Sequence, residues 1–162
     1  MTSITVFYAL FFITLLAAWI WGGKPERIGG AIHLALACLQ GAFYLVVPPS
    51  FASLDGISLL TDALGLAGFG WLALAANRMW PIWAASLQLL SLAGHFARWA
   101  QLEIAPYAYS LLRTAPTALG LLVLLLAVVV HRKRLKQSGQ DRPWVDWRAL
   151  RKNHFAHLHR KS

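Results

Sequence analysis

The chain has 162 residues, of which 58% are hydrophobic and only 13% are charged. A soluble globular domain carries about a quarter of charged residues, so this composition argues against an ordinary soluble enzyme or binding domain. A membrane-spanning helix needs about 20 mostly apolar residues, and most of the chain divides into runs of that length. The sequence therefore predicts an all-α integral membrane bundle.

The predicted transmembrane domain covers residues 1–130 and has five spans, at about 4–21, 28–47, 57–76, 80–100 and 106–130. The first run ends at Trp19 and Trp21, which are typical of a membrane interface. It lacks the basic start and the cleavage site of a signal peptide, so we expect it to be retained. Pro116 is expected to bend the fifth span. The one cysteine, Cys38, lies in an apolar run and permits no intrachain disulfide.

The net charge of +9 belongs to the C-terminal end, because residues 131–162 hold ten Lys/Arg and two Asp. Under the positive-inside bias this tail is cytoplasmic, and counting back through five spans places the N-terminus in the periplasm. The loops agree, since the turns at 22–27 and 77–78 carry cations, whereas the loops at 48–56 and 101–105 carry acids and no Lys/Arg.

The tail combines basic and aromatic residues at helical spacing from Pro143 onward. This pattern predicts a partly amphipathic helix on an anionic inner leaflet, with a disordered basic tail as the alternative. Nucleic acid is not the expected partner. The residues assigned to the membrane surface are Arg132, Lys133, Arg134, Lys136, Trp144, Trp147, Arg148, Arg151 and Lys152.

Two of the predicted spans carry polar stripes. Polar groups in hydrocarbon are costly without partners, so each stripe should face other helices. The stripe on the fourth span is Gln88, Ser91, His95 and Arg98, spaced by three, four and three; that on the second is His33, Gln40 and Tyr44, spaced by seven and four.

Depths along the helices bring four ionisable groups into the outer half of the membrane. At about 1.5 Å per residue, Asp62 and Arg113 lie roughly 7 and 10 Å below the outer ends of their spans. Their opposite charges predict an ion pair, and small residues beside Asp62 allow close helix approach. His95 and Arg98 lie in the same half, and His95 is expected either to bond to Asp62 or to line a water-filled entrance.

This constellation has two interpretations: it locks helices together, or it forms a polar pocket open to the outer side. No nucleophile–base pair, phosphate-binding loop or paired carboxylates support an enzyme. No cofactor and no metal are expected. A shared haem iron is disfavoured because His33 and His95 differ in depth by more than about 10 Å.

The stretch Ala75-Ala76-Asn77-Arg78-Met79-Trp80-Pro81-Ile82-Trp83-Ala84-Ala85, with Gln88 and His95 beyond it, resembles small multi-pass inner-membrane proteins of alphaproteobacteria, especially those of sphingomonads. The resemblance covers most of the spanning region and rests on no catalytic motif. It implies a bacterial inner-membrane protein and no particular activity.

The leading functional prediction is a non-catalytic inner-membrane protein that acts as an accessory or interaction subunit. The alternative is a small-molecule or proton binding or transport protein with an outward-facing polar pocket, and a third is an intramembrane enzyme. Expected partners are the lipid bilayer, with anionic lipid at the C-terminal tail, and another membrane protein.

Overall fold

The computed structural model describes residues 2–46, 56–100 and 106–146, and the all-α prediction is confirmed for them. Apart from one isolated bridge, these residues form no β-structure. The helices are α1 (Thr2–Trp21), α2 (Lys24–Tyr44), α3 (Gly56–Ala75), α4 (Trp80–Trp99) and α5 (Pro106–Ser138).

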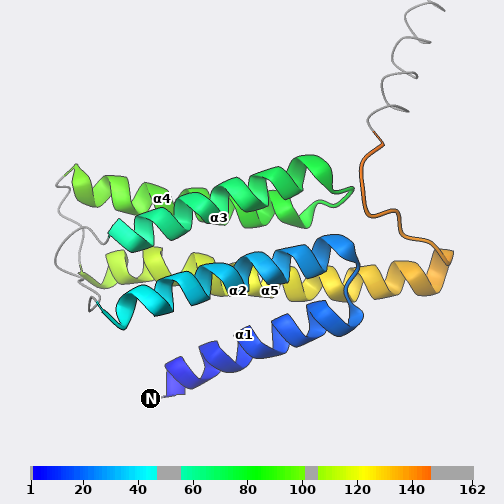
Figure 1. Cartoon of the computed structure of the whole chain (residues 1–162), viewed down its shortest axis with the longest axis horizontal. Helices are drawn as coiled ribbons and strands as arrows, with labels where there is room; N and C mark the ends of the chain where they lie inside the picture. The colour runs from blue at the N-terminus through cyan, green and yellow to red at the C-terminus, as the bar shows by residue number, and fades with distance from the viewer. Residues whose placement is uncertain (1, 47–55, 101–105, 147–162) are drawn as a thin grey trace, which may run out of the picture.

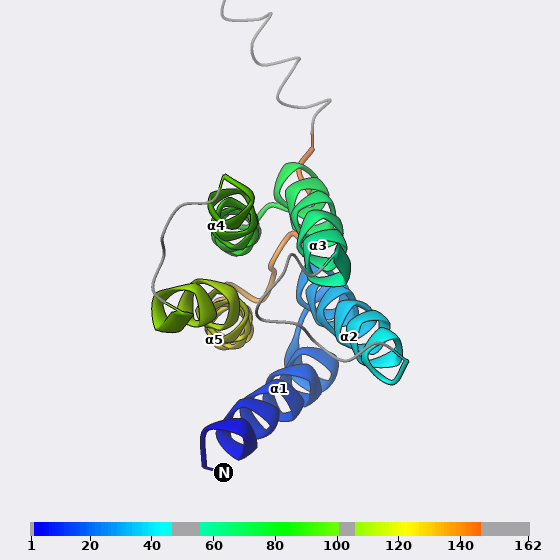
Figure 2. The ribbon, with the colours of Figure 1, turned by 90° about the vertical axis from the view of Figure 1, so that its left-hand side faces the viewer.

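The five helices form a ring in the order in which they occur in the chain. Successive helices run in opposite directions (Figure 1), and the view along the bundle shows α1 closing the ring between α2 and α5 (Figure 2). The turns after α1 and α3 and the residues after α5 therefore share one end of the bundle, which we name the basic end. Among the described residues there, eight Lys/Arg stand against three Asp/Glu.

Three helices contain stretches long and apolar enough to cross a membrane: Ile4–Trp21, Gly56–Ala75 and Thr114–Ser138. By this criterion the described residues contain three candidate spans and not the five predicted, because α2 and α4 do not meet it. The cause is visible in their sequences. α2 begins with Lys24, Glu26 and Arg27, and α4 carries its polar stripe. The mean hydropathy of each is therefore lower than that of α1 and α3.

The starting point of α2 also differs from the prediction. Residues 22–27 were expected to form a turn, yet α2 already begins at Lys24. Pro25 lies in its first turn, where a missing backbone N–H costs no helical hydrogen bond. Glu26 is thereby placed on a helix that enters the bundle, and not in a solvated loop.

The core lies inside the ring and is densest towards the basic end. Phe69, Leu72 and Leu124 have no exposed surface there, and Trp80, which belongs to the same cluster, is nearly buried. The Trp80 ring lies against the backbone of Gly29, so closely that a methyl group at that position would overlap it. The contact fixes the distance between α2 and the start of α4, as small residues do where helices approach closely.

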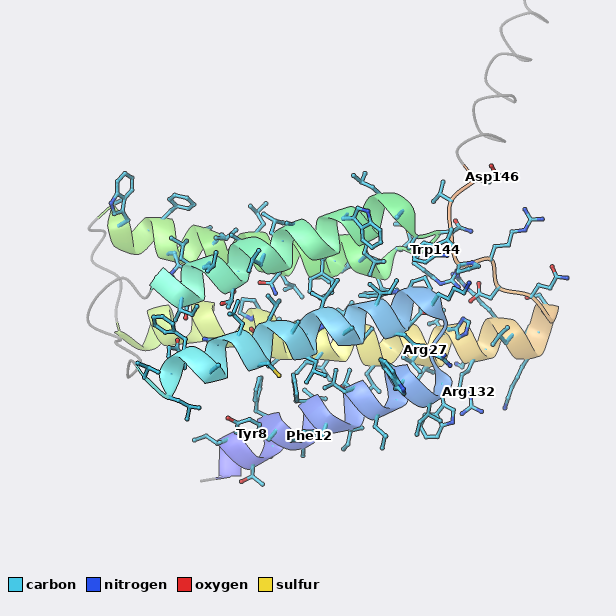
Figure 3. The ribbon with its side chains drawn as sticks, in the orientation of Figure 1. Tyr8, Phe12, Arg27, Arg132, Trp144 and Asp146 are labelled. Carbon is cyan, nitrogen blue, oxygen red and sulfur yellow. The ribbon has the colours of Figure 1, made fainter. Side chains whose placement is uncertain are left out.

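The outside of the ring is apolar as well. Tyr8 and Phe12 on α1 point away from the bundle (Figure 3), and 55% and 64% of their surfaces are exposed. Large exposed apolar side chains occur on every helix, among them Trp71, Leu89 and Leu126. A monomeric soluble protein rarely exposes so continuous an apolar surface, whereas a membrane domain needs one.

The chain folds back after α5 and ties itself to the α3–α4 turn. α5 continues past Val130 to Ser138, and Gly139 (φ 66°) ends it in the left-handed region that favours glycine. Residues 139–146, which we name the strap, then run to the basic end. Ala76 and Trp144 form an antiparallel bridge, with hydrogen bonds of 3.0 Å from the Asn77 N–H to the Pro143 carbonyl and from the Val145 N–H to the Ala75 carbonyl.

The strap corrects the expectation of an amphipathic helix beginning at Pro143. Residues 143–146 are extended, and the Trp144 ring packs 6.4 Å from that of Trp71 (Figure 3). The backbone of these residues pairs with the α3–α4 turn and does not form the helix that the spacing of the side chains predicts. The remainder of the predicted helix, including Trp147, Arg148, Arg151 and Lys152, lies outside the described residues.

Candidate functional site

A carboxylate on α3 holds two polar side chains of α4. Asp62 Oδ2 accepts a hydrogen bond of 2.6 Å from Ser91 Oγ and lies 3.1 Å from His95 Nε2, which donates in the tautomer protonated there. His95 is 1% exposed, and the side chain of Asp62 is 15% exposed. We name these three residues the Asp62 cluster. The bond between His95 and Asp62 is one of the two arrangements that the sequence predicts for His95.

The geometry of the Asp62 cluster does not make Ser91 a nucleophile. Its hydroxyl donates to the carboxylate and not to the His95 ring, which would have to take its proton. Both side chains instead converge on one charged acceptor between two helices. This arrangement stabilises helix pairing, and it leaves His95 Nδ1 buried without a hydrogen bond among the described residues.

The polar stripe of α4 faces the bundle, as its spacing predicts. Gln88, Ser91 and His95 are all buried. Gln88 packs against Gly65 of α3, where an added methyl group would lie 2.8 Å from the amide carbon, and this confirms the close approach expected beside Asp62. The side chains of Arg98 and Arg113 lie outside the described residues, so the predicted ion pair of Asp62 with Arg113 stays a prediction.

The second predicted stripe divides into two parts. Gln40 Nε2 donates to Tyr44 Oη (3.0 Å) and Ser58 Oγ (3.2 Å), and the two hydroxyls lie 2.9 Å apart, so this part joins α2 to α3. His33 lies separately in the core. Its Nδ1 is 3.0 Å from the Gly29 carbonyl of its own helix, and its ring centre is 4.9 Å from that of Phe69.

Glu26 is the most deeply buried charged residue of the described chain, with no exposed surface. Its Oε1 accepts a hydrogen bond of 3.1 Å from Trp80 Nε1 and one of 3.3 Å from Arg78 Nε. One carboxylate of α2 is thus shared by the α3–α4 turn and the first residue of α4. A buried carboxylate requires such donors, because isolated burial of its charge is very costly.

Arg78 continues this contact to the strap. Its Nη2 lies 2.7 Å from Asp141 Oδ2, at an angle outside hydrogen-bond geometry, so this contact is an ion pair. Its Nη1 donates to the carbonyls of Asn77 and Arg142, both at 3.0 Å. His131 Nδ1 of α5 approaches the same Asp141 oxygen at 2.6 Å. We name Glu26, Arg78, His131 and Asp141 the basic-end network.

Sequence reasoning missed the basic-end network. It assigned Glu26 and Arg78 to turns and Asp141 to the basic cytoplasmic tail, and it predicted no partner for any of the three. A usable signal was present: Glu26 and Asp141 are acids within the most basic part of the chain. An acid in such surroundings is a natural partner for a buried cation.

The residues assigned to a membrane-surface tail are distributed over different elements. Arg132, Lys133, Arg134 and Lys136 lie on the last turns of α5 and are exposed. The Arg132 guanidinium lies 5.2 Å from the centre of the Trp21 ring, at the end of α1 (Figure 3). This cation–π contact is typical of a membrane interface, where an indole and a cation meet at the headgroup level.

No family model, no curated protein and no solved structure matches this chain. Within the part of the chain that the structure describes, no three His, Cys, Asp or Glu side chains gather as they would around a metal ion. The Asp62 cluster and the basic-end network are therefore interpreted from their geometry, in which charged and polar groups bind one another between helices.

Proposed function

We propose that this chain is a non-catalytic integral protein of the bacterial inner membrane, acting as an accessory or interaction subunit. The observation that supports the proposal is how the buried polar groups are used. Asp62 binds partners on α4, and Glu26 and Asp141 bind partners across α2, α5 and the α3–α4 turn. Such contacts fix helix positions, and they leave the outer apolar faces of the helices available to other membrane proteins.

The proposal includes five membrane spans with the N-terminus in the periplasm. α2 and α4 have 21 and 20 residues, about the length that a bilayer requires, and they lie beside the three more apolar helices in one ring. His33 of α2 and Gln88, Ser91 and His95 of α4 are buried inside the bundle, so these polar groups lower the hydropathy of the two helices without facing lipid. The excess of Lys/Arg assigns the basic end to the cytoplasm.

Exposed Trp residues mark a membrane interface at the basic end. Trp19, Trp21, Trp71 and Trp83 are all exposed near the basic end of their helices. Indole rings gather at the level of the lipid headgroups, so these residues indicate the plane of the cytoplasmic interface. Anionic lipid is the proposed partner of the basic end, and the inner-membrane location follows from the resemblance to alphaproteobacterial membrane proteins.

The size of the native assembly tests the accessory role. The chain would be solubilised in a mild detergent from membranes of its source bacterium and, separately, from a heterologous host. Native electrophoresis should give a larger assembly from the source bacterium only. Equal sizes from both hosts would contradict an accessory role, because the chain would then assemble without a specific partner.

A second candidate is the binding or relay of protons at the Asp62 cluster. It is favoured by one observation: Asp62 keeps 15% of its side chain exposed, beside a buried His95 nitrogen that has no hydrogen bond among the described residues. Proteoliposomes with a pH-sensitive dye inside distinguish the two functions. Proton flux that Asp62→Asn abolishes would support the relay, whereas flux equal to that of empty liposomes supports the structural role.

A further inference from the structure

A groove opens between α4 and α5 at the basic end, beside the basic-end network. Its volume is about 360 Å³, within the range of about 300–1,000 Å³ found for small-molecule sites. Trp83 forms one wall from α4, and Val123, Leu126 and Val130 form the other from α5. Arg78, His131 and Arg134 lie at its end. The groove is therefore apolar along its length and cationic at one end.

The α5 wall follows a single helical stripe that ends in a cation. Val123, Leu126, Val130 and Arg134 succeed one another at intervals of three and four residues, so they share one face. At about 1.5 Å per residue, the stripe from Val123 to Arg134 is about 16 Å long, close to the half-thickness of about 15 Å of a bilayer core. The groove thus matches the depth of one leaflet.

The cations at the groove end are not equivalent. Arg78 is already paired with Glu26 and Asp141. Arg134 is only 4.0 Å from Asp141 Oδ1, at the limit of an ion pair, and 51% of its side chain is exposed. Arg134 therefore has guanidinium donors available for an added phosphate, with which it can form a bidentate contact.

We propose that this groove binds one anionic phospholipid of the basic-end leaflet, with an acyl chain between α4 and α5 and the phosphate on Arg134. The inference rests on the proposed membrane topology, in which the basic end faces the cytoplasm. Charge complementarity commits the site to an anionic lipid: the described residues of this end hold eight Lys/Arg against three Asp/Glu. The apolar length of the groove requires the acyl chain, which a free phosphate lacks.

The test uses the full chain, delipidated in detergent and titrated with phosphatidylglycerol or with phosphatidylcholine of the same acyl chains. Native mass spectrometry counts the lipid retained. We expect preferential retention of one phosphatidylglycerol, weakened about fivefold by Arg134→Gln, as one lost cation contact implies. The matched control is Lys133→Gln, which removes the same charge from an exposed neighbour that does not line the groove, and it should retain the preference.

Two further arms separate the acyl chain from the headgroup. Val130→Trp should fill the groove and reduce retention of both lipids, whereas Val129→Trp, at an exposed neighbour outside the groove, should not. Glycerophosphoglycerol, the headgroup without acyl chains, should not compete. Equal effects of Arg134→Gln and Lys133→Gln, or no effect of Val130→Trp, would overturn the proposal. Neither outcome changes the size of the native assembly, so the accessory role is tested separately.

Discussion

Arg78 of the α3–α4 turn and Glu26 of α2 meet inside the basic end, where Nε and Oε1 are 3.3 Å apart and the side chains are 5% and 0% exposed. Burial removes both charges from water, so each depends on the other and on their neighbours. The pair joins the start of α2 to the α3–α4 turn, and the second ion pair of Arg78 extends this connection to the strap.

Glu26→Gln should lower the thermal stability of the purified protein in detergent. Loss of one partner from a buried ion pair typically costs about 3–5 kcal/mol, because the other charge stays buried. Arg78 keeps Asp141, so the lower part of that range is expected. The matched control is Lys136→Gln at an exposed position of α5, which should leave the melting temperature unchanged. Equal melting temperatures of Glu26→Gln and wild type would contradict the assigned role.

Ser91→Ala should destabilise the contact between α3 and α4. The serine hydroxyl donates to a charged carboxylate at 2.6 Å, and such bonds contribute about 1.5–3 kcal/mol. Ser86→Ala is the control on the same helix, since its exposed hydroxyl bonds only to the Ile82 carbonyl one turn earlier. In thermal melts, Ser91→Ala should unfold at a clearly lower temperature than Ser86→Ala. A Ser91→Ala melt that matches the Ser86→Ala melt would show that the bond to Asp62 adds no stability.

The ion pair of Asp62 with Arg113 is tested by a double-mutant cycle. Asp62→Asn and Arg113→Gln should each lower stability, because each leaves one charge without its partner inside the bundle. The double variant should lose less than the sum of the two. Strict additivity of the single losses would exclude the pairing, and Ser91 and His95 would then be the partners of Asp62 within the described part of the chain.

Two glycine substitutions should change the free energy of unfolding in opposite directions. Gly139→Ala forces a side chain into the left-handed region at φ 66°, which costs about 1–2 kcal/mol. Gly70→Ala lies within α3 with open space around the added methyl group, so it should stabilise the protein by about 0.4–1 kcal/mol. Chemical or thermal unfolding of both variants measures the difference. Stabilisation by Gly139→Ala would show that the strap does not need this turn.

Membrane topology is tested with a reporter that is active only in the periplasm. Fused within the loop at 48–56 it should be active, and fused after Ser162 it should be silent, because the proposed topology assigns the basic end, with its excess of Lys/Arg, to the cytoplasm. Activity after Ser162 would reverse the orientation. The leaflet assigned to the proposed lipid site would then reverse as well.

The sequence was sufficient where a pattern repeats within one helix. The helical segments and the inward orientation of Gln88, Ser91 and His95 follow from apolar runs and from spacings of three and four. The count of five spans does not follow in the same way, since the polar stripes that identify inner faces also lower the hydropathy of α2 and α4.

The sequence was insufficient where contacts join distant segments. Nothing in the spacing near Pro143 distinguishes a surface helix from a strand-like pairing, and the pairing depends on free backbone groups in the α3–α4 turn. The same holds for Glu26, whose partners Arg78 and Trp80 lie more than 50 positions later in the chain. Sequence reasoning assigned Glu26 and Arg78 to turns, whereas the fold buries both side chains.

The antiparallel bridge between Ala76 and Trp144 gives the biosynthesis of this protein an order. Translation proceeds at about 5–20 residues per second, so Arg78 is made several seconds before Asp141. During that interval Arg78 can already meet Glu26 but still lacks its second carboxylate. The strap can therefore join the basic end only after α5 has been made, and a chain interrupted before the strap would lack the ion pair of Arg78 with Asp141.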